Sequence, residues 1–292
     1  MRKFSDGNPL VLLAYFSAAA GIAMFTMHPV LLGLSFLGSA AYWLFSGGDR
    51  SFKNQLFPIC LLLGLTLLNP LVYHNGQTVL FVMNHNPITL EAALYGLMSG
   101  VMASGVLYWF RSFCRIMSSD KLLYLFGSLS PKTALLLSMA LRYVPLYKKQ
   151  AQAIQQAQKG LGLYKEDNAL DSMKGGMRVF SSLTTWALET GIVTADSMAA
   201  RGYGIGRRTF FSLFRFTRRD GLLLTVTALL AAGTLLPMGS GALEFTYYPV
   251  ISSLSGSFTA WTGYVCYGLL CLLPTLMDTL EVLQWKYLQS GI

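Results

Sequence analysis

The stretch "ITLEAALYGLMSGVMASGVLYWF", residues 88–110, decides the fold class. It is apolar along most of its length, and its one charged residue, Glu91, lies near one end. A helix needs roughly 20 apolar residues to cross the hydrocarbon core of a bilayer. We therefore predict that this stretch spans a membrane.

Five further stretches predict spans at 9–26, 28–46, 55–73, 221–238 and 261–283. The 292-residue chain is 53% hydrophobic and only 12% charged, whereas soluble domains are about a quarter charged. We expect an all-α polytopic membrane protein with about six transmembrane helices and a cytoplasmic bundle of amphipathic helices. Four spans would occupy 1–110, the cytoplasmic domain 111–219, and the last two spans 220–292.

The charge distribution predicts the orientation of these spans. Residues 111–219 contain 17 of the 22 Lys and Arg residues but 6 of the 13 Asp and Glu residues, a net charge of +11 against −2 for the rest. Loops 27–29, 69–87 and 239–260 have no Lys or Arg. Basic loops stay on the cytoplasmic side of a membrane. Both termini and the basic segment are therefore expected in the cytoplasm. Residues 1–20 imitate a secretory signal, but we expect them to be retained, because losing the first span would break this alternation.

Gly96 and Gly100 form a GxxxG pattern inside the fourth predicted span. Small residues at this spacing let helix backbones approach closely in lipid. The pattern is consistent with packing inside this protein or with a smooth surface for a neighbouring membrane subunit.

The basic segment predicts two long helices that each end in a glycine-rich tip. Lys132–Tyr147 is apolar but too short to span, and Arg142 and Pro145 are expected to interrupt it. The stretch "LYKKQAQAIQQAQKGLG", residues 146–162, then predicts a helix that ends at Gly160 and Gly162. A second helix is expected from an N-cap at Asp171–Ser172 to Arg201–Gly202. An apolar stripe should follow it: Leu183, Trp186, Ala187, Thr190 and Val193.

No motif for catalysis or nucleotide binding is present in the sequence. It lacks a phosphate-binding G-x-x-x-x-G-K-[ST] loop, an HExxH metal site and a GxSxG nucleophile elbow. His28, His74 and His85 fall in predicted external loops, where we expect solvated side chains. The four cysteines have no metal or disulfide spacing and are expected to be free thiols. We expect no enzyme activity, cofactor, metal or nucleic-acid partner. A self-sufficient permease stays as an alternative, although it would need ionisable or broken-helix features near mid-bilayer, which the spans largely lack.

Two stretches together resemble a known family. "LSMALRYVPLYKKQAQAIQQAQKGLG", residues 137–162, and "ADSMAARGYG", residues 195–204, are similar to the transmembrane T component (EcfT/CbiQ type) of energy-coupling factor (ECF) transporters. The similarity is close over about 130–206, and the pattern of spans is compatible with the family over the whole chain.

The resemblance implies a scaffold subunit in a prokaryotic cell membrane, part of an ABC importer for vitamins or metal ions. In that family two coupling helices end in Ala-Arg-Gly tips that seat in grooves of two ABC-type ATPases, which bind the ATP. The spans hold a small substrate-binding S component.

Carried onto this chain, the second tip is Ala200, Arg201 and Gly202. The first tip does not carry over intact: Gly160, Leu161 and Gly162 stand at its position, with leucine where the family usually has arginine, and Lys159, two residues away, is the candidate for a partial substitute. Gly96, Gly100, Arg142 and Pro145 are candidates for contact with the S component or for helix packing.

Overall fold

The structure is a computed structural model that describes residues 4–47, 52–73, 76–83, 86–163, 169–206, 214, 216–253 and 256–290. The chain divides into two compact units. Unit 1 contains residues 1–118 and 214–292, and unit 2 contains residues 119–213.

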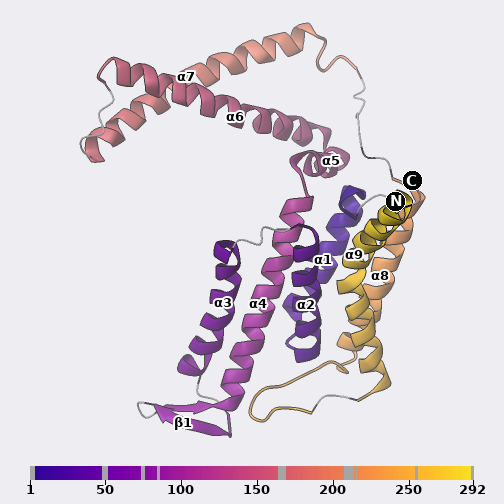
Figure 1. Ribbon diagram of the computed structural model, residues 1–292. Coiled ribbons are helices and arrows are strands. Elements are labelled where there is room, and N and C mark those ends of the chain that lie inside the picture. Colours follow the sequence, from indigo (N-terminus) through magenta and orange to yellow (C-terminus); the bar gives the residue numbers. More distant parts are fainter. Residues whose placement is uncertain are drawn as a thin grey trace. The chain divides into compact units, whose positions relative to one another are not determined.

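In its described residues, unit 1 is a bundle of six helices preceded by a single 3₁₀ turn, Phe4–Asp6. The helices are α1 (Pro9–Phe25), α2 (Pro29–Phe45), α3 (Phe52–Val72), α4 (Leu90–Ile116), α8 (Arg218–Gly239) and α9 (Phe258–Ser290). α4 packs against α1, α2 and α3, while α9 packs against α2 and α8 (Figure 1). The prediction of an all-α polytopic membrane protein is confirmed.

By length and composition, four of the described helices could cross a membrane: α3, α4, α8 and α9. α1 and α2 are also apolar, but each has only 17 residues. That length is at the lower limit for a helix that crosses a bilayer upright. The total of six spans stays a prediction.

Glycine allows α4 to approach α3 closely. A Cβ atom on Gly100 would lie 2.8 Å from the Leu62 carbonyl oxygen, and one on Gly96 would lie 2.8 Å from the Asn69 Cβ. Gly38 in α2 lies equally close to α9, since a Cβ atom on Gly38 would lie 2.6 Å from the Cβ atom of Cys271. Dispersion and backbone proximity, rather than exclusion of water, hold helices together in lipid. These glycines therefore set the helix spacing of unit 1.

The centre of unit 1 is a cluster of aromatic rings packed edge to face. The Phe4 and Tyr15 ring centroids are 5.1 Å apart, and those of Phe16 and Trp109 are 6.0 Å apart. Two polar atoms at the ring edges are bonded within the bundle. The Tyr15 hydroxyl donates to the Leu270 carbonyl at 2.8 Å, and Trp109 Nε1 donates to Ser35 Oγ at 3.0 Å. A polar group left unbonded in hydrocarbon would cost several kcal/mol, as a rough figure.

A short antiparallel hairpin precedes α4. Its strands are β1 (Val79–Met83) and β2 (Asn86–Thr89). The sequence analysis did not identify it, because the surrounding apolar residues resemble the start of a span. Glu91 fixes the chain beside the hairpin, since its carboxylate accepts a hydrogen bond from the Thr78 amide at 3.2 Å.

The prediction of a solvated His28 is wrong. Its side chain is 2% exposed, and Nε2 lies 3.0 Å from the Tyr264 hydroxyl. The segment after α8 covers this histidine, since the Phe245 ring packs on it and the Tyr247 hydroxyl donates to the Met27 carbonyl at 2.8 Å. Burial raises the pKa of Tyr247 to about 12. His74 and His85 lie outside the described residues.

Unit 2 consists of three helices, α5 (Ser119–Leu129), α6 (Pro131–Gly160) and α7 (Ala169–Ala200). α5 packs against α6, and α6 packs against α7. None of the described residues of α6 is buried, in contrast with the cores of α1, α2 and α4. Unit 2 thus exposes two long helices, and these carry the residues that the sequence singles out.

Candidate functional site

α6 is one continuous helix of 30 residues, so the predicted interruption at Arg142 and Pro145 is wrong. It begins with proline at its first position, where the missing amide costs nothing. Pro145 removes one hydrogen bond inside the helix, a loss of roughly 3 kcal/mol. Contacts with α7 on both sides of this proline, through Tyr143 and Tyr147, offset part of the loss, at about 0.5–1.5 kcal/mol each. Arg142 and Pro145 are themselves exposed.

α7 begins at Ala169, two residues before the predicted cap. Asp171 therefore lies in the first turn rather than at the N-cap, where its carboxylate still favours the positive end of the helix dipole. Four of the five predicted stripe residues are partly covered: Leu183, Trp186, Ala187 and Thr190. Val193 is 63% exposed, and Thr194 makes the contact with α6 instead.

The two helices cross at a small aromatic contact. The Tyr143 hydroxyl donates to Thr194 Oγ1 at 3.1 Å, and the Tyr147 and Trp186 rings meet edge to face at 5.8 Å. Tyr143 and Tyr147 stack on each other at 5.4 Å. α6 and α7 form an X, and the end of α6 and the end of α7 lie at opposite extremities of it (Figure 1). The crossing therefore lies between the ends of the two helices.

Both ends close in the same hydrogen-bond motif. At the end of α6, Gly162 has φ +68°, its amide donates to the Lys159 carbonyl at 3.0 Å, and the Leu163 amide donates to Gln158 at 2.9 Å. At the end of α7, Gly202 has φ +80°, its amide donates to Ala199 at 3.0 Å, and the Tyr203 amide donates to Met198 at 3.0 Å. This is the Schellman closure, which needs glycine because of the positive φ.

The shared motif aligns the two tips residue by residue. Gly162 matches Gly202, Leu161 matches Arg201, and Gly160 matches Ala200. The structure thus gives the same pairing of Gly160-Leu161-Gly162 with Ala200-Arg201-Gly202 that the family resemblance implies. Leu161 is 73% exposed and Arg201 is also exposed, so both side chains are available to a partner. Lys159 lies in the last turn of α6.

The predicted site residues therefore fall into three groups. The tip residues lie at the two ends of the crossed pair, while Arg142 and Pro145 lie at the crossing. Gly96 and Gly100 lie in unit 1 and face α3, so these two glycines serve packing inside the chain.

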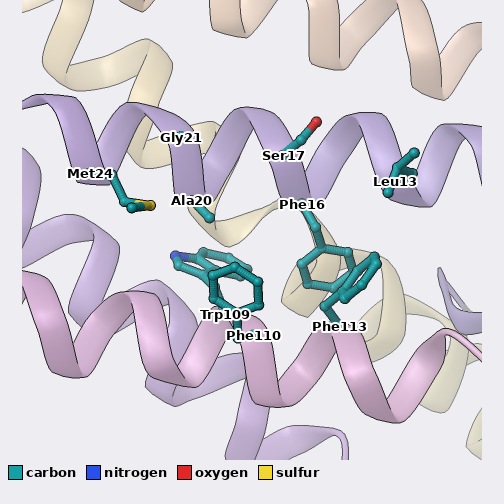
Figure 2. Close-up of a pocket in the computed structure, with 9 residues that line it drawn as sticks. All are labelled: Leu13, Phe16, Ser17, Ala20, Gly21, Met24, Trp109, Phe110 and Phe113. Atoms are coloured by element: carbon teal, nitrogen blue, oxygen red, sulfur yellow. The ribbon is translucent and has the colours of Figure 1, made fainter.

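An apolar cavity of about 290 Å³ lies between α1 and α4 in unit 1 (Figure 2). Leu13, Phe16, Met24, Trp109, Phe110 and Phe113 supply most of its walls. The one hydroxyl that lines it, on Ser17, donates to the Ala14 carbonyl at 3.0 Å. The other described residues that line it are apolar or aromatic.

Among the described residues, no group of three or more His, Cys, Asp or Glu side chains could hold a metal ion. Cys60, Cys114, Cys266 and Cys271 are all free thiols, as the sequence predicts.

The chain is similar to two curated proteins. It is 27% identical over 200 residues to the energy-coupling factor transporter transmembrane protein EcfT 1 of Listeria monocytogenes, a match that covers 63% of this chain and 74% of that protein. It is 36% identical over 103 residues to the energy-coupling factor transporter transmembrane protein EcfT of Lacticaseibacillus paracasei, covering 33% of this chain and 39% of that protein. No model of a protein family matches the chain. The two relatives support the EcfT type, and with it a transmembrane component of an energy-coupling factor transporter.

Proposed function

We propose that this protein is the membrane scaffold subunit of an ECF-type ABC importer for a vitamin or a metal ion. It transmits the ATP-driven motion of two ABC-type ATPases through α6 and α7 to a small substrate-binding S component. The ATPases bind the ATP, and this chain contributes no catalytic residue. Both termini and unit 2 lie on the cytoplasmic side of a prokaryotic cell membrane. The two relatives named EcfT support the class of transporter.

The observation that carries the proposal is the pair of matched tips on crossed helices. At about 1.5 Å per residue, the tips lie roughly 24 Å and 16 Å beyond the crossing along α6 and α7. When the two ATPases close on ATP, they carry the tips with them. Because the aromatic contact joins the helices between the tips, a movement of the tips turns one helix against the other. That rotation of the helices is transmitted to the S component.

Arg201 is the strongest anchor that the tips offer. It follows the C-terminal end of a long helix, where carbonyl groups lack partners and the helix dipole is negative. The guanidinium presents five N–H donors in a plane, which suits a groove lined with carboxylates or carbonyls. Gly202 follows without a side chain, so a partner can approach the backbone closely.

Co-purification tests the proposal. The tagged full-length chain is extracted from its native membrane in mild detergent, and the proteins that accompany it are identified by mass spectrometry. We expect ABC-type ATPases together with a small membrane protein, and ATP hydrolysis by the purified complex. A chain that purifies alone and drives uptake in vesicles without ATP would show that the permease alternative is correct.

A further inference from the structure

The two tips have the same backbone but different chemistry. The α6 tip presents Leu161 at 73% exposure and Leu163 at 51% exposure, both apolar. The α7 tip presents the exposed Arg201 at the position that matches Leu161, and Tyr203 at 48% exposure at the position that matches Leu163. Since the hydrogen bonds of the two closures correspond one to one, the side chains leave the backbone in corresponding directions.

An interaction with α7 also braces the α6 tip. Arg178 Nη1 donates a hydrogen bond of 2.8 Å to the carbonyl of Leu163, the residue that completes the α6 closure. Arg178 lies near the start of α7, so this bond joins the tip of one helix to the beginning of the other. This bond restrains the backbone of the tip just beyond Leu161 before any partner binds. Preorganisation of this kind lowers the entropy cost of docking.

A partner groove suited to one tip is unsuited to the other. A groove that accepts Arg201 needs acceptors, and these would stay buried and unpaired opposite a leucine. A groove that accepts Leu161 needs apolar walls, and an arginine there would be a buried charge without a partner.

We propose that the α6 tip docks through Leu161 and Leu163 into an apolar groove that contains no buried carboxylate. The α7 tip docks through Arg201 into a different groove lined with acceptors. This inference rests on the proposed function, and it adds the chemistry of each groove. Because the grooves differ, they belong to two different ATPase polypeptides. Each tip therefore binds one particular ATPase of the two, and Leu161 and Arg201 are the residues that determine which one.

Photo-cross-linking from matched positions tests the assignment. The photoreactive residue p-benzoylphenylalanine is placed at Leu163 in one sample and at Tyr203 in another, in the full chain in its native membrane. These positions are equivalent in the two closures and leave Leu161 and Arg201 intact. We expect ABC-type ATPase peptides from two different polypeptides: an apolar groove peptide from Leu163, and a peptide containing Asp or Glu from Tyr203.

Substitutions at the tips give the second measurement. Leu161→Arg should lower the cross-linking yield from position 163 at least about tenfold, because it buries a charge without a partner. Leu161→Met is the matched control, and its yield should stay within about threefold because a volume-conserving exchange is well tolerated. Exchange of the two tips, Leu161→Arg with Arg201→Leu, should lower both yields.

Three outcomes would overturn the assignment. A Leu161→Arg chain that cross-links as well as the wild type would show that the α6 groove contains an acceptor. The same groove peptide of one ATPase polypeptide, cross-linked from both positions, would show that the grooves are identical. Cross-links to proteins other than ABC-type ATPases from both positions would overturn the proposed function as well, whereas the first two outcomes leave it standing.

Discussion

The close contact of α3 and α4 makes a direct prediction about Gly100. A Cβ atom added there would lie 2.8 Å from the Leu62 carbonyl oxygen and 3.2 Å from the Leu62 Cα. Both atoms belong to the α3 backbone, so a side-chain rotation cannot relieve the clash and the helices must separate. Overpacking of this kind typically costs about 1–3 kcal/mol. The better helix propensity of alanine returns about 0.5–1 kcal/mol, so Gly100→Ala should be destabilised by up to about 2.5 kcal/mol.

Gly64 offers a matched control on α3. No atom lies within 4 Å of a Cβ built at Gly64, so Gly64→Ala gains helix propensity without a clash. Thermal unfolding of each variant in detergent, followed by size-exclusion chromatography of the surviving fraction, measures the difference. At about 2–4 °C per kcal/mol, Gly100→Ala should unfold a few degrees below the wild type and Gly64→Ala at or above it. Equal stability of Gly100→Ala and Gly64→Ala would refute the close packing of α3 on α4.

Two further predictions concern the membrane. A cysteine at the exposed Gly256 should react with an impermeant thiol reagent in intact cells, whereas one at the exposed Gly176 should react only after lysis. Labelling of Gly176→Cys in intact cells would show that the orientation is the reverse. Gly256 is preferred to Gly76, because a Cβ at Gly76 would lie 2.6 Å from Glu91 Oε2. Replacing Arg218 and Arg219 in the first turn of α8 by glutamine should lower correct insertion of this helix, measured by the same labelling. Each basic residue near the surface contributes about 1 kcal/mol of attraction to anionic lipid. Unchanged insertion would show that these two side chains are merely solvated.

Composition and hydrophobic periodicity were sufficient to predict the helical class, the apolar helices of unit 1 and the two long helices of unit 2. The ends of those helices were predictable as well, because glycine at a positive φ is a local requirement. Gly162 and Gly202 each close a helix by bonds to residues within one turn.

Features that depend on distant residues could not be read from the sequence. The continuity of α6 through Pro145 depends on α7 contacts about 50 residues away in the chain, such as the bond from Tyr143 to Thr194. His28 is buried because residues near 245 and 264 fold over it. The helix that packs against Gly96 and Gly100 could not be predicted either, because a GxxxG pattern does not identify the neighbouring helix. Only the structure identifies α3.

The corresponding bonds of the two tips are another such feature. The family resemblance already pairs Leu161 with Arg201, and the matching backbone bonds of the two closures, which composition does not encode, support the same pairing. Arg178, which braces the α6 tip, carries no motif and was missed by the sequence analysis. Only its distance of 2.8 Å to the Leu163 carbonyl identifies it.

The central claim is that the α7 tip is held by a partner that hydrolyses ATP, and Arg201 tests it most directly. ABC-type ATPases that co-purify with the chain are quantified for the wild type, Arg201→Ala and Arg201→Lys, and uptake is measured in the same cells. Arg201→Ala should lower ATPase recovery at least about tenfold and stop uptake, because losing one partner of a buried charged contact costs about 2–5 kcal/mol. Arg201→Lys should restore only part of both, since an ammonium does not reproduce the planar guanidinium. The membrane level of each variant should equal that of the wild type, because Arg201 is exposed. Normal ATPase recovery and normal uptake by Arg201→Ala would contradict the account, because Arg201 would then only cap its own helix.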